Sequence, residues 1–333
     1  MRRLATLCIL LPLLISCATT TSAVPRWVTH TYDEVYPQSI YLAAVGSGAD
    51  RDAAVDRAYT ALSQVFSTAV QSTIVTSTHV GTTGGSAAAE EFSESSDFFA
   101  WGEIRTLIEN LVGSEVVNTY IDADGLLYAR VVMHRQKSAE HYSREIATLA
   151  QQRSALARQR GNTTDPLAAW MLVNEEIALA SKADTLGAQV ATLTGLQPQS
   201  MLAPLMLERK RLAANIGVNI AVVAQEEATE KRIASALAVW VTEQGFSLDP
   251  AGPYQLRVIY ADETEEMAGS PYAHVRYHIS GSVRTEKLHY LSFEASKRET
   301  ALSEAQARLR AMESAAKAVA ADLTAALAGQ IQP

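Results

Sequence analysis

The N-terminus constrains this chain most, because it decides in which compartment the rest of the chain folds. Arg2 and Arg3 precede a short apolar run that ends in the sequence LISC at 14–17. A short basic segment, a short apolar segment and small residues in this order are typical of an export signal. The apolar run at 7–15 is far shorter than the roughly 20 residues that a transmembrane helix needs. We therefore predict that residues 1–16 are a signal peptide and that the chain is exported.

The LISC sequence resembles a bacterial lipobox, in which the signal is cut directly before the cysteine. This resemblance implies that Cys17 carries lipid on its sulfur and on the new amino terminus, and that 17–24 form a lipidated tether. The polar composition of this tether favours lipidation over the alternative, an ordinary signal with a chance cysteine. Residue 18 is Ala and not Asp, which in the best-studied sorting system directs a lipoprotein to the outer membrane. The expected location is therefore the cell envelope, most specifically the outer membrane.

The composition of the mature chain excludes several classes of function. Cys8 leaves with the signal and Cys17 is acylated, so neither a disulfide, a thiolate metal site nor a cysteine nucleophile is expected. Loss of Arg2 and Arg3 reduces the basic residues from 28 to 26 against 36 acidic ones. This negative balance argues against nucleic acid as a partner and against adhesion to anionic lipid head groups. The lipid on Cys17 is therefore expected to hold the protein at the membrane, at about 0.8 kcal/mol per buried methylene.

Hydrophobic periodicity predicts an α+β fold with two small sheet-plus-helix units and a helical connector. The first unit, 25–135, has the order βαββ: its first strand ends in Gly46-Ser47-Gly48, and its last two strands flank an Asp-Gly turn. A helix at 48–76 begins at the capping box of Ser47 and Asp50. Its apolar face is expected to carry Ala54, Ala58, Ala61, Val65 and Ala69.

The connector and the second unit follow. Residues 136–212 are predicted to be helical, with one helix starting at Asp165-Pro166. Residues 213–330 have the order βαβββα, with a helix ended by Gly245 and a last helix capped by Ser303 and Gln306. Trp240 is expected in the core of this unit. The last helix is expected to bury one side consisting of Ala305, Leu309, Met312, Ala316, Val319 and Leu323.

Residues 25–134 resemble the Lpp-twenty lipoprotein family. The matching features are Pro25-Arg26-Trp27-Val28, the run YLAAVGSG at 41–48, the alanine-rich helix and the two strands around the Asp-Gly turn. The resemblance implies an α+β module on a lipid-anchored envelope protein, without defined catalytic residues; a similar module occurs in envelope proteins that assist flagellar assembly. The C-terminal half lies outside it. Residues 216–328 are similar, in fold only, to α+β domains of periplasmic assembly factors.

Three small motifs resemble parts of known ligand sites, but for each an explanation without a ligand is favoured. Gly46-Ser47-Gly48 lacks the third glycine of a dinucleotide loop and the lysine of a phosphate loop, which favours a tight strand-to-helix turn. Asp122 and Asp124 lack the other ligands of a calcium loop, which favours a hairpin turn. His274 and His278 share one strand face, are expected to look toward solvent, and lie too far apart, about 13 Å, to share a metal. We therefore predict neither metal nor cofactor.

No catalytic sequence motif was found, so the chain is expected not to be an enzyme. A triad assembled only by folding is not excluded by sequence order. Phe98, Phe99 and Trp101 follow an acidic, glycine- and serine-rich stretch. They are candidates for an exposed patch that docks a partner, and the alternative is that they cover a sheet edge.

These features favour a lipid-anchored envelope lipoprotein that acts by binding, as a structural or assembly partner of another envelope protein or of peptidoglycan. The alternative is a ligand-binding or enzymatic lipoprotein with a site between the two α+β units. A third hypothesis is a subunit of an oligomeric ring, a homo-oligomer built through the edges of the C-terminal sheet.

Overall fold

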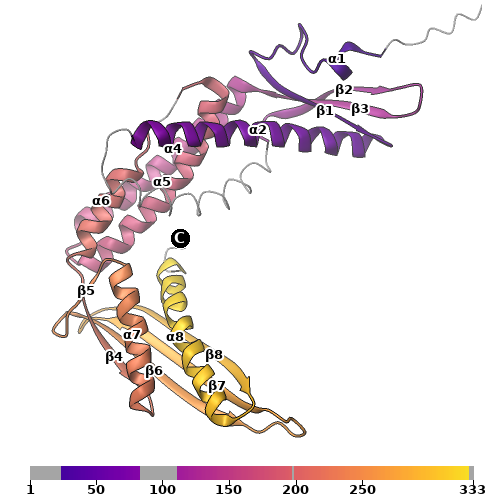
Figure 1. The fold of residues 1–333 in the computed structure, drawn as a ribbon. Helices are drawn as coiled ribbons and strands as arrows, with labels where there is room; N and C mark the ends of the chain where they lie inside the picture. The colour runs from indigo at the N-terminus through magenta and orange to yellow at the C-terminus, as the bar shows by residue number, and fades with distance from the viewer. Residues whose placement is uncertain (1–23, 83–110, 197–198, 330–333) are drawn as a thin grey trace, which may run out of the picture. The chain divides into compact units, whose positions relative to one another are not determined.

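A computed structural model of the chain describes residues 24–82, 111–196 and 199–329 (Figure 1). It contains one three-stranded and one five-stranded sheet together with long helices. This confirms the predicted α+β class with its βαββ and βαβββα units and helical connector. The chain forms two compact units, Met1–Ala69 with Thr106–Lys137 and Val70–Arg105 with Ser138–Pro333. Within the residues described, no helix is both long and apolar enough to cross a bilayer.

The first unit is an antiparallel sheet with the strand order β1-β3-β2. Its elements are α1 (Arg26–Thr29), β1 (Tyr41–Gly48), α2 (Arg51–Thr82), β2 (Ser114–Ile121) and β3 (Leu127–His134). The predicted hairpin joins β2 to β3: the Asp122 carboxylate accepts hydrogen bonds from the backbone N–H groups of Asp124 and Leu126. Gly125 adopts a positive φ of 82°, which a glycine reaches without strain. The Asp-Gly signal therefore reflects turn chemistry.

Over residues 51–73, helix α2 buries one side chain in every four. Asp50 caps it, accepting a hydrogen bond from the Ala53 N–H at 2.8 Å. The buried stripe consists of Ala54, Ala58, Leu62, Phe66 and Val70. The prediction was right for the two first alanines and wrong for Val65, which is 47% exposed. Leu62 and Phe66 are buried in place of Ala61 and Val65, which the prediction had put in the core. The buried residues therefore lie four positions apart.

Two glycines of β1 let α2 lie directly on the strand. A Cβ atom built on Gly46 would come closer than 3.0 Å to backbone atoms of Ala54 and Ala58, and one on Gly48 would meet the backbone of Ala53 and Ala54. Real Cβ atoms essentially never show such distances. The sequence Gly-Ser-Gly is therefore required by the close contact between helix and strand.

The helical segment consists of α4 (Arg135–Asn162), α5 (Pro166–Thr194) and α6 (Leu202–Ala213). As predicted, Asp165 caps α5, accepting from the Ala168 N–H at 2.8 Å. The first turns of α5 also pack into the hydrophobic core of the C-terminal sheet. There the ring centroids of Trp170 and Phe246 lie 4.9 Å apart. The Tyr290 hydroxyl donates to Asp165 at 2.5 Å. The start of α5 is thus attached to the C-terminal sheet by both apolar and polar contacts.

The C-terminal part of the second unit contains a mixed sheet with the order β5-β4-β6-β7-β8. The pairs β4–β5 and β4–β6 are parallel, whereas β6–β7 and β7–β8 are antiparallel. The elements are β4 (Gly217–Val223), α7 (Glu227–Glu243), β5 (Ser247–Leu248), β6 (Tyr254–Glu265), β7 (Ala273–Arg284), β8 (His289–Ala301) and α8 (Glu304–Gly329). Strands β6, β7 and β8 are longer than the stretches in which apolar and polar residues alternate. Polar residues at their ends continue the backbone hydrogen bonding between the strands.

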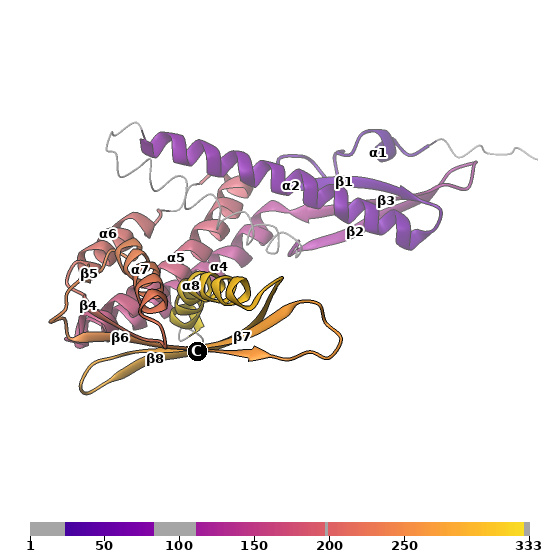
Figure 2. The same ribbon diagram turned by 60° about the horizontal axis from the view of Figure 1, so that its bottom comes forward.

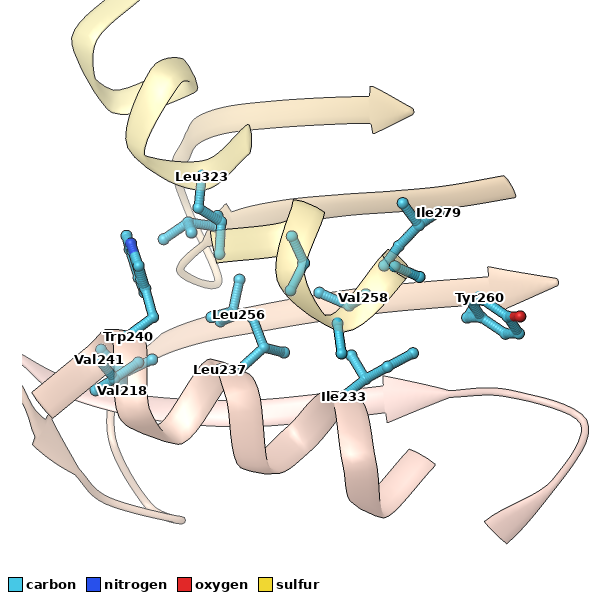
Figure 3. Packing of buried hydrophobic residues seen from close by; sticks show 14 of the residues in the cluster. Val218, Ile233, Leu237, Trp240, Val241, Leu256, Val258, Tyr260, Ile279 and Leu323 are labelled. Carbon is cyan, nitrogen blue, oxygen red and sulfur yellow. The ribbon is translucent and has the colours of Figure 1, made fainter. Parts of the chain in front are cut away.

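Both α7 and α8 cover the same face of this sheet (Figure 2). Ile233 and Leu237 of α7 point toward Leu256 and Val258 of β6 (Figure 3). Trp240 is buried, as predicted, and its indole N–H donates to the Thr324 hydroxyl at 3.0 Å.

The predicted face of α8 is wrong in its first half. Ala305 and Leu309 are exposed, Leu309 by 52%, and the buried side chains there are Ala307, Ala311 and Ala315. The predicted buried face was aligned with the large apolar residue Leu309, which in fact lies on the exposed side. The helix instead turns its smallest side chains toward the strands, where alanine permits a close approach.

Gly46→Ala tests the helix–strand contact. The added methyl group has to displace helix backbone, so the free energy of unfolding should fall by roughly 3 kcal/mol, the upper part of the range for overpacking. Gly161→Ala in α4 is the matched control, because a Cβ there meets no atom within 4 Å. We expect the control to be neutral or slightly stabilising. Urea unfolding of both variants measures the difference, and equal stability would contradict the close contact.

Candidate functional site

The predicted lipidation site and docking patch lie outside the described residues. Cys17 falls within 1–23, and Phe98, Phe99 and Trp101 fall within 83–110. Lipidation and docking therefore stay predictions. The structure does show how the chain that follows the tether is held in the first unit.

A buried arginine clamps this N-terminal segment to the sheet. Arg130 lies on β3 and is 2% exposed. Its guanidinium donates to Asp33 Oδ2 at 2.7 Å and to the Thr31 carbonyl at 3.2 Å. It also donates twice to Asn118 Oδ1 of β2, from Nε at 2.9 Å and from Nη2 at 2.6 Å. We call these four residues the Arg130 clamp.

Aromatic rings complete the surroundings of the guanidinium. Its central carbon lies 4.6 Å from the ring centre of Tyr36 and 5.6 Å from that of Trp27. Both distances fall within the range of a cation–π interaction. Trp27 is itself buried, so the residues directly after the tether form part of the folded unit.

The clamp lies on the side of the sheet opposite α2. Ala129 pairs with Gly46, whose face is covered by α2, so Arg130 next to it points to the other face. Residues 129–133 are all buried. The central strand is thus covered on one face by a helix and on the other by the N-terminal segment.

The clamp also sets the charge of Asp33. Although burial acts to raise it, the pKa of Asp33 is held below its ordinary value by the Tyr36 backbone N–H and by Arg130. The carboxylate therefore stays ionised and paired with the guanidinium in the folded unit.

Neither of the two loop motifs forms a ligand site. The space next to Gly46 and Gly48 is filled by α2, and the Asp122 carboxylate is used by its own turn. The Asp122 turn agrees with the predicted hairpin, whereas Gly46-Ser47-Gly48 was predicted to form a tight turn and instead lies within β1, where its glycines let α2 approach. Within the described ranges, no group of three or more His, Cys, Asp and Glu residues could hold a metal.

The prediction for the two histidines of β7 is only half right. His278 is exposed and lies 3.9 Å from a Glu263 carboxylate oxygen. His274 is 9% exposed instead of facing solvent. Its ring is hydrogen-bonded to the Ser270 hydroxyl at 2.8 Å and to the Thr300 hydroxyl at 2.9 Å. The ring thus has one partner in the loop before β7 and one on β8, and alternation along a single strand reveals neither contact.

The sheet face opposite α7 and α8, which we call the outer face, carries exposed polar and charged residues. Arg276 and Arg298 lie directly opposite each other on β7 and β8. Like charges so placed repel, and Glu265 offsets this by accepting hydrogen bonds from both. These hydrogen bonds lower the pKa of Glu265 below its ordinary value. Sequence periodicity places these residues on one face, but the bridging role of Glu265 depends on strand register.

Comparisons with known proteins identify partial likenesses. No family model and no curated protein matches the chain. A secreted protein of Helicobacter pylori has 16% identity and a TM-score of 0.41, over 76% of this chain and 85% of that chain. A minor lipoprotein of Acinetobacter baumannii has 12% identity and a TM-score of 0.28, over 34% of this chain and 92% of that chain. The rare lipoprotein B of Shewanella oneidensis has 12% identity and a TM-score of 0.27, over 34% and 96%. The similarity to these two bacterial lipoproteins is limited to about a third of the chain.

Arg130→Met should unfold the clamp. The substitution leaves Asp33 and Asn118 without their partner; because the Asp33 side chain is 30% exposed and reaches water, we expect a loss of about 1–3 kcal/mol in the free energy of unfolding. Arg51→Met is the control, because Arg51 is exposed and such surface changes stay within about 0.5 kcal/mol. Urea unfolding, together with proteolysis of the segment 25–40, measures the effect. If both variants are cleaved and unfold alike, the clamp does not hold the segment.

Asp33→Asn should change the pH dependence of the first unit. A folded pKa below the unfolded value of 3.8 contributes stability that is present above pH 3.8 and is lost as the pH falls through the folded pKa. The variant should therefore be less stable than the wild type at pH 7, and this difference should shrink below pH 3.8. Thermal unfolding between pH 7 and pH 2 measures it. A constant difference over this range would contradict the pairing.

Proposed function

We propose that this chain is a lipid-anchored lipoprotein of the bacterial cell envelope that acts by binding and not by catalysis. One observation carries the proposal. The LISC sequence at 14–17 ends at Cys17, the first of the eight tether residues 17–24, and the tether is followed by a segment that the Arg130 clamp holds on the sheet. Because an extended chain spans at most about 3.6 Å per residue, the tether keeps the first unit within roughly 30 Å of the membrane. A lipid on Cys17 would thus be coupled directly to a folded body.

The finer parts of the proposal are its location and its partner. Ala18 supports the outer membrane, and the sequence similarity of residues 25–134 supports an Lpp-twenty-like module. The partner is another envelope protein or peptidoglycan, and nucleic acid is disfavoured by the excess of acidic over basic residues. Phe98, Phe99 and Trp101 are the proposed docking patch, since exposed aromatic residues are frequent anchors of interfaces.

Metabolic labelling with a fatty-acid probe tests the anchor. The wild type should be labelled and recovered with membranes, whereas Cys17→Ala should lose the label because it lacks the acceptor sulfur. Cys8→Ala is the matched control: Cys8 leaves with the signal, so labelling should persist. A Cys17→Ala protein labelled as strongly as the wild type would overturn the lipidation site, and with it the proposed localisation.

The labelled protein then serves to test binding. Crosslinking in whole cells should capture a discrete envelope component or peptidoglycan. A variant with Phe98→Ser, Phe99→Ser and Trp101→Ser should retain the label and lose the crosslink, because only the docking patch is altered. Retention of the crosslink in this variant would refute the patch as the docking site.

A further inference from the structure

Strand β8 forms an open edge of the C-terminal sheet. It has 13 residues, His289–Ala301, and pairs with β7 on one side. No strand within the described residues pairs with its other side. An edge strand presents a row of unpaired backbone N–H and C=O groups and is a ready template for another strand. Its length makes β8 a strong candidate for such pairing.

The charges on β8 complement each other in one antiparallel register. Glu294 and Arg298 both point to the outer face and lie two residues on either side of Ser296. When two copies of β8 pair around Ser296, Glu294 of each copy lies opposite Arg298 of the other. Opposite charges in directly paired positions stabilise a sheet. One two-fold axis therefore forms two cross-strand pairs.

Both side chains can take part in this contact. Glu294 is exposed, and its neighbour on β7 is the uncharged Ser280. Arg298 is exposed as well and donates to Glu265 through Nε. A guanidinium has five N–H groups, so donors are left for a second carboxylate. The pairing needs no existing ion pair to be broken.

Other registers are less favourable. A two-fold axis at Arg298 would place Lys297 opposite Glu299, but it would also place Arg298 against its own copy. Lys297 and Glu299 are moreover already joined within the strand at 2.8 Å. An axis at Ser296 pairs Leu291 with Ala301 at the ends and keeps the outer faces of both copies on one side, because paired residues of adjacent strands share a face.

We propose that two copies of this chain associate through β8, antiparallel and centred on Ser296, to form one continuous ten-stranded sheet. The inference rests on the edge and its charges alone, and it holds whether or not Cys17 is lipidated. It specifies the contact of a homo-oligomer, which the sequence suggested only in general terms.

Disulfide crosslinking tests the register in the full-length chain. Cys8→Ala and Cys17→Ala remove the native thiols, and Ser296→Cys or Ser292→Cys then introduces a single new one. At the axis the two Cα atoms lie about 4.5–5.5 Å apart, within the range of about 4.4–6.8 Å for a disulfide. The two 292 positions are separated by eight residue steps, about 26 Å. Both serines are exposed on the same face of β8, so the second variant is a close control.

Under mild oxidation, Ser296→Cys should form a covalent dimer at least tenfold faster than Ser292→Cys. Equal crosslinking of the two variants would indicate random collision and would overturn the proposal. Absence of crosslinking in both would overturn it too. Because neither variant can be lipidated, the result is independent of the labelling experiment.

Charge reversal provides a second measurement. Glu294→Arg places two guanidinium groups opposite each other in each cross-strand pair, and Arg298→Glu places two carboxylates there, so each variant alone should sediment as a monomer. In a mixture, every charged position faces its opposite, and a heterodimer should form. Singly substituted proteins that dimerise like the wild type, or a mixture that stays monomeric, would contradict the register. Far-UV circular dichroism confirms that both variants are folded before they are mixed.

Discussion

The architecture depends on close contact between alanine-lined helices and sheets. In the first unit, Gly46 and Gly48 remove the side chains that would separate β1 from α2. In the second unit, α8 turns a row of alanines toward the strands. Gly281 of β7 makes room in the same way, because the ring of Phe293 occupies the position that its Cβ would take. Small residues bring backbones together and gain dispersion contacts over many atoms. They also tolerate little enlargement where the opposing atoms belong to backbone.

The Arg130 clamp solves a different problem, namely how to cover the second face of a sheet of three strands. One helix covers only one face, so the N-terminal segment has to cover the other. A guanidinium with several hydrogen bonds and two aromatic neighbours attaches this segment to the central strand, and the Tyr32 hydroxyl adds a hydrogen bond that it accepts from the Ala43 N–H of β1. The Arg130–Asp33 ion pair and the hydrogen bond to the Thr31 carbonyl connect this segment to the central strand through a buried guanidinium and a partly exposed carboxylate. The chain directly after the tether is thereby ordered.

Local signals predicted most of the elements, and contacts distant in sequence account for the errors. The Asp122–Gly125 turn, the Asp165 cap and the burial of Trp240 each depend on neighbours within a few residues or on a strong apolar period. The exposure of Val65 and Leu309 depends on which side of a helix the sheet approaches, and size alone misjudges this. His274 is buried by a loop, and the two-residue strand β5 exists only because β4 lies beside it. The Arg130 clamp joins residues almost a hundred positions apart, so sequence reading missed it; a lone arginine among apolar residues of a strand was its one visible signal.

The single helical layer of the second unit explains why its remaining edge matters. With α7 and α8 on one face, the outer face is polar, and the ladder can grow only at the edges of the sheet. Many edge strands avoid growth by being short, by a bulge or by like charges that repel a second copy. In β8 the irregularity lies at one end, opposite Val283 and Arg284, and the stretch from Leu291 to Ala301 is regular. Its two outward charges, Glu294 and Arg298, have opposite signs, so a two-fold axis at either residue would bring like charges together, whereas an axis at Ser296 pairs opposite ones. If the edge of β8 only had to avoid pairing with another strand, charges of one sign would repel a second copy more effectively.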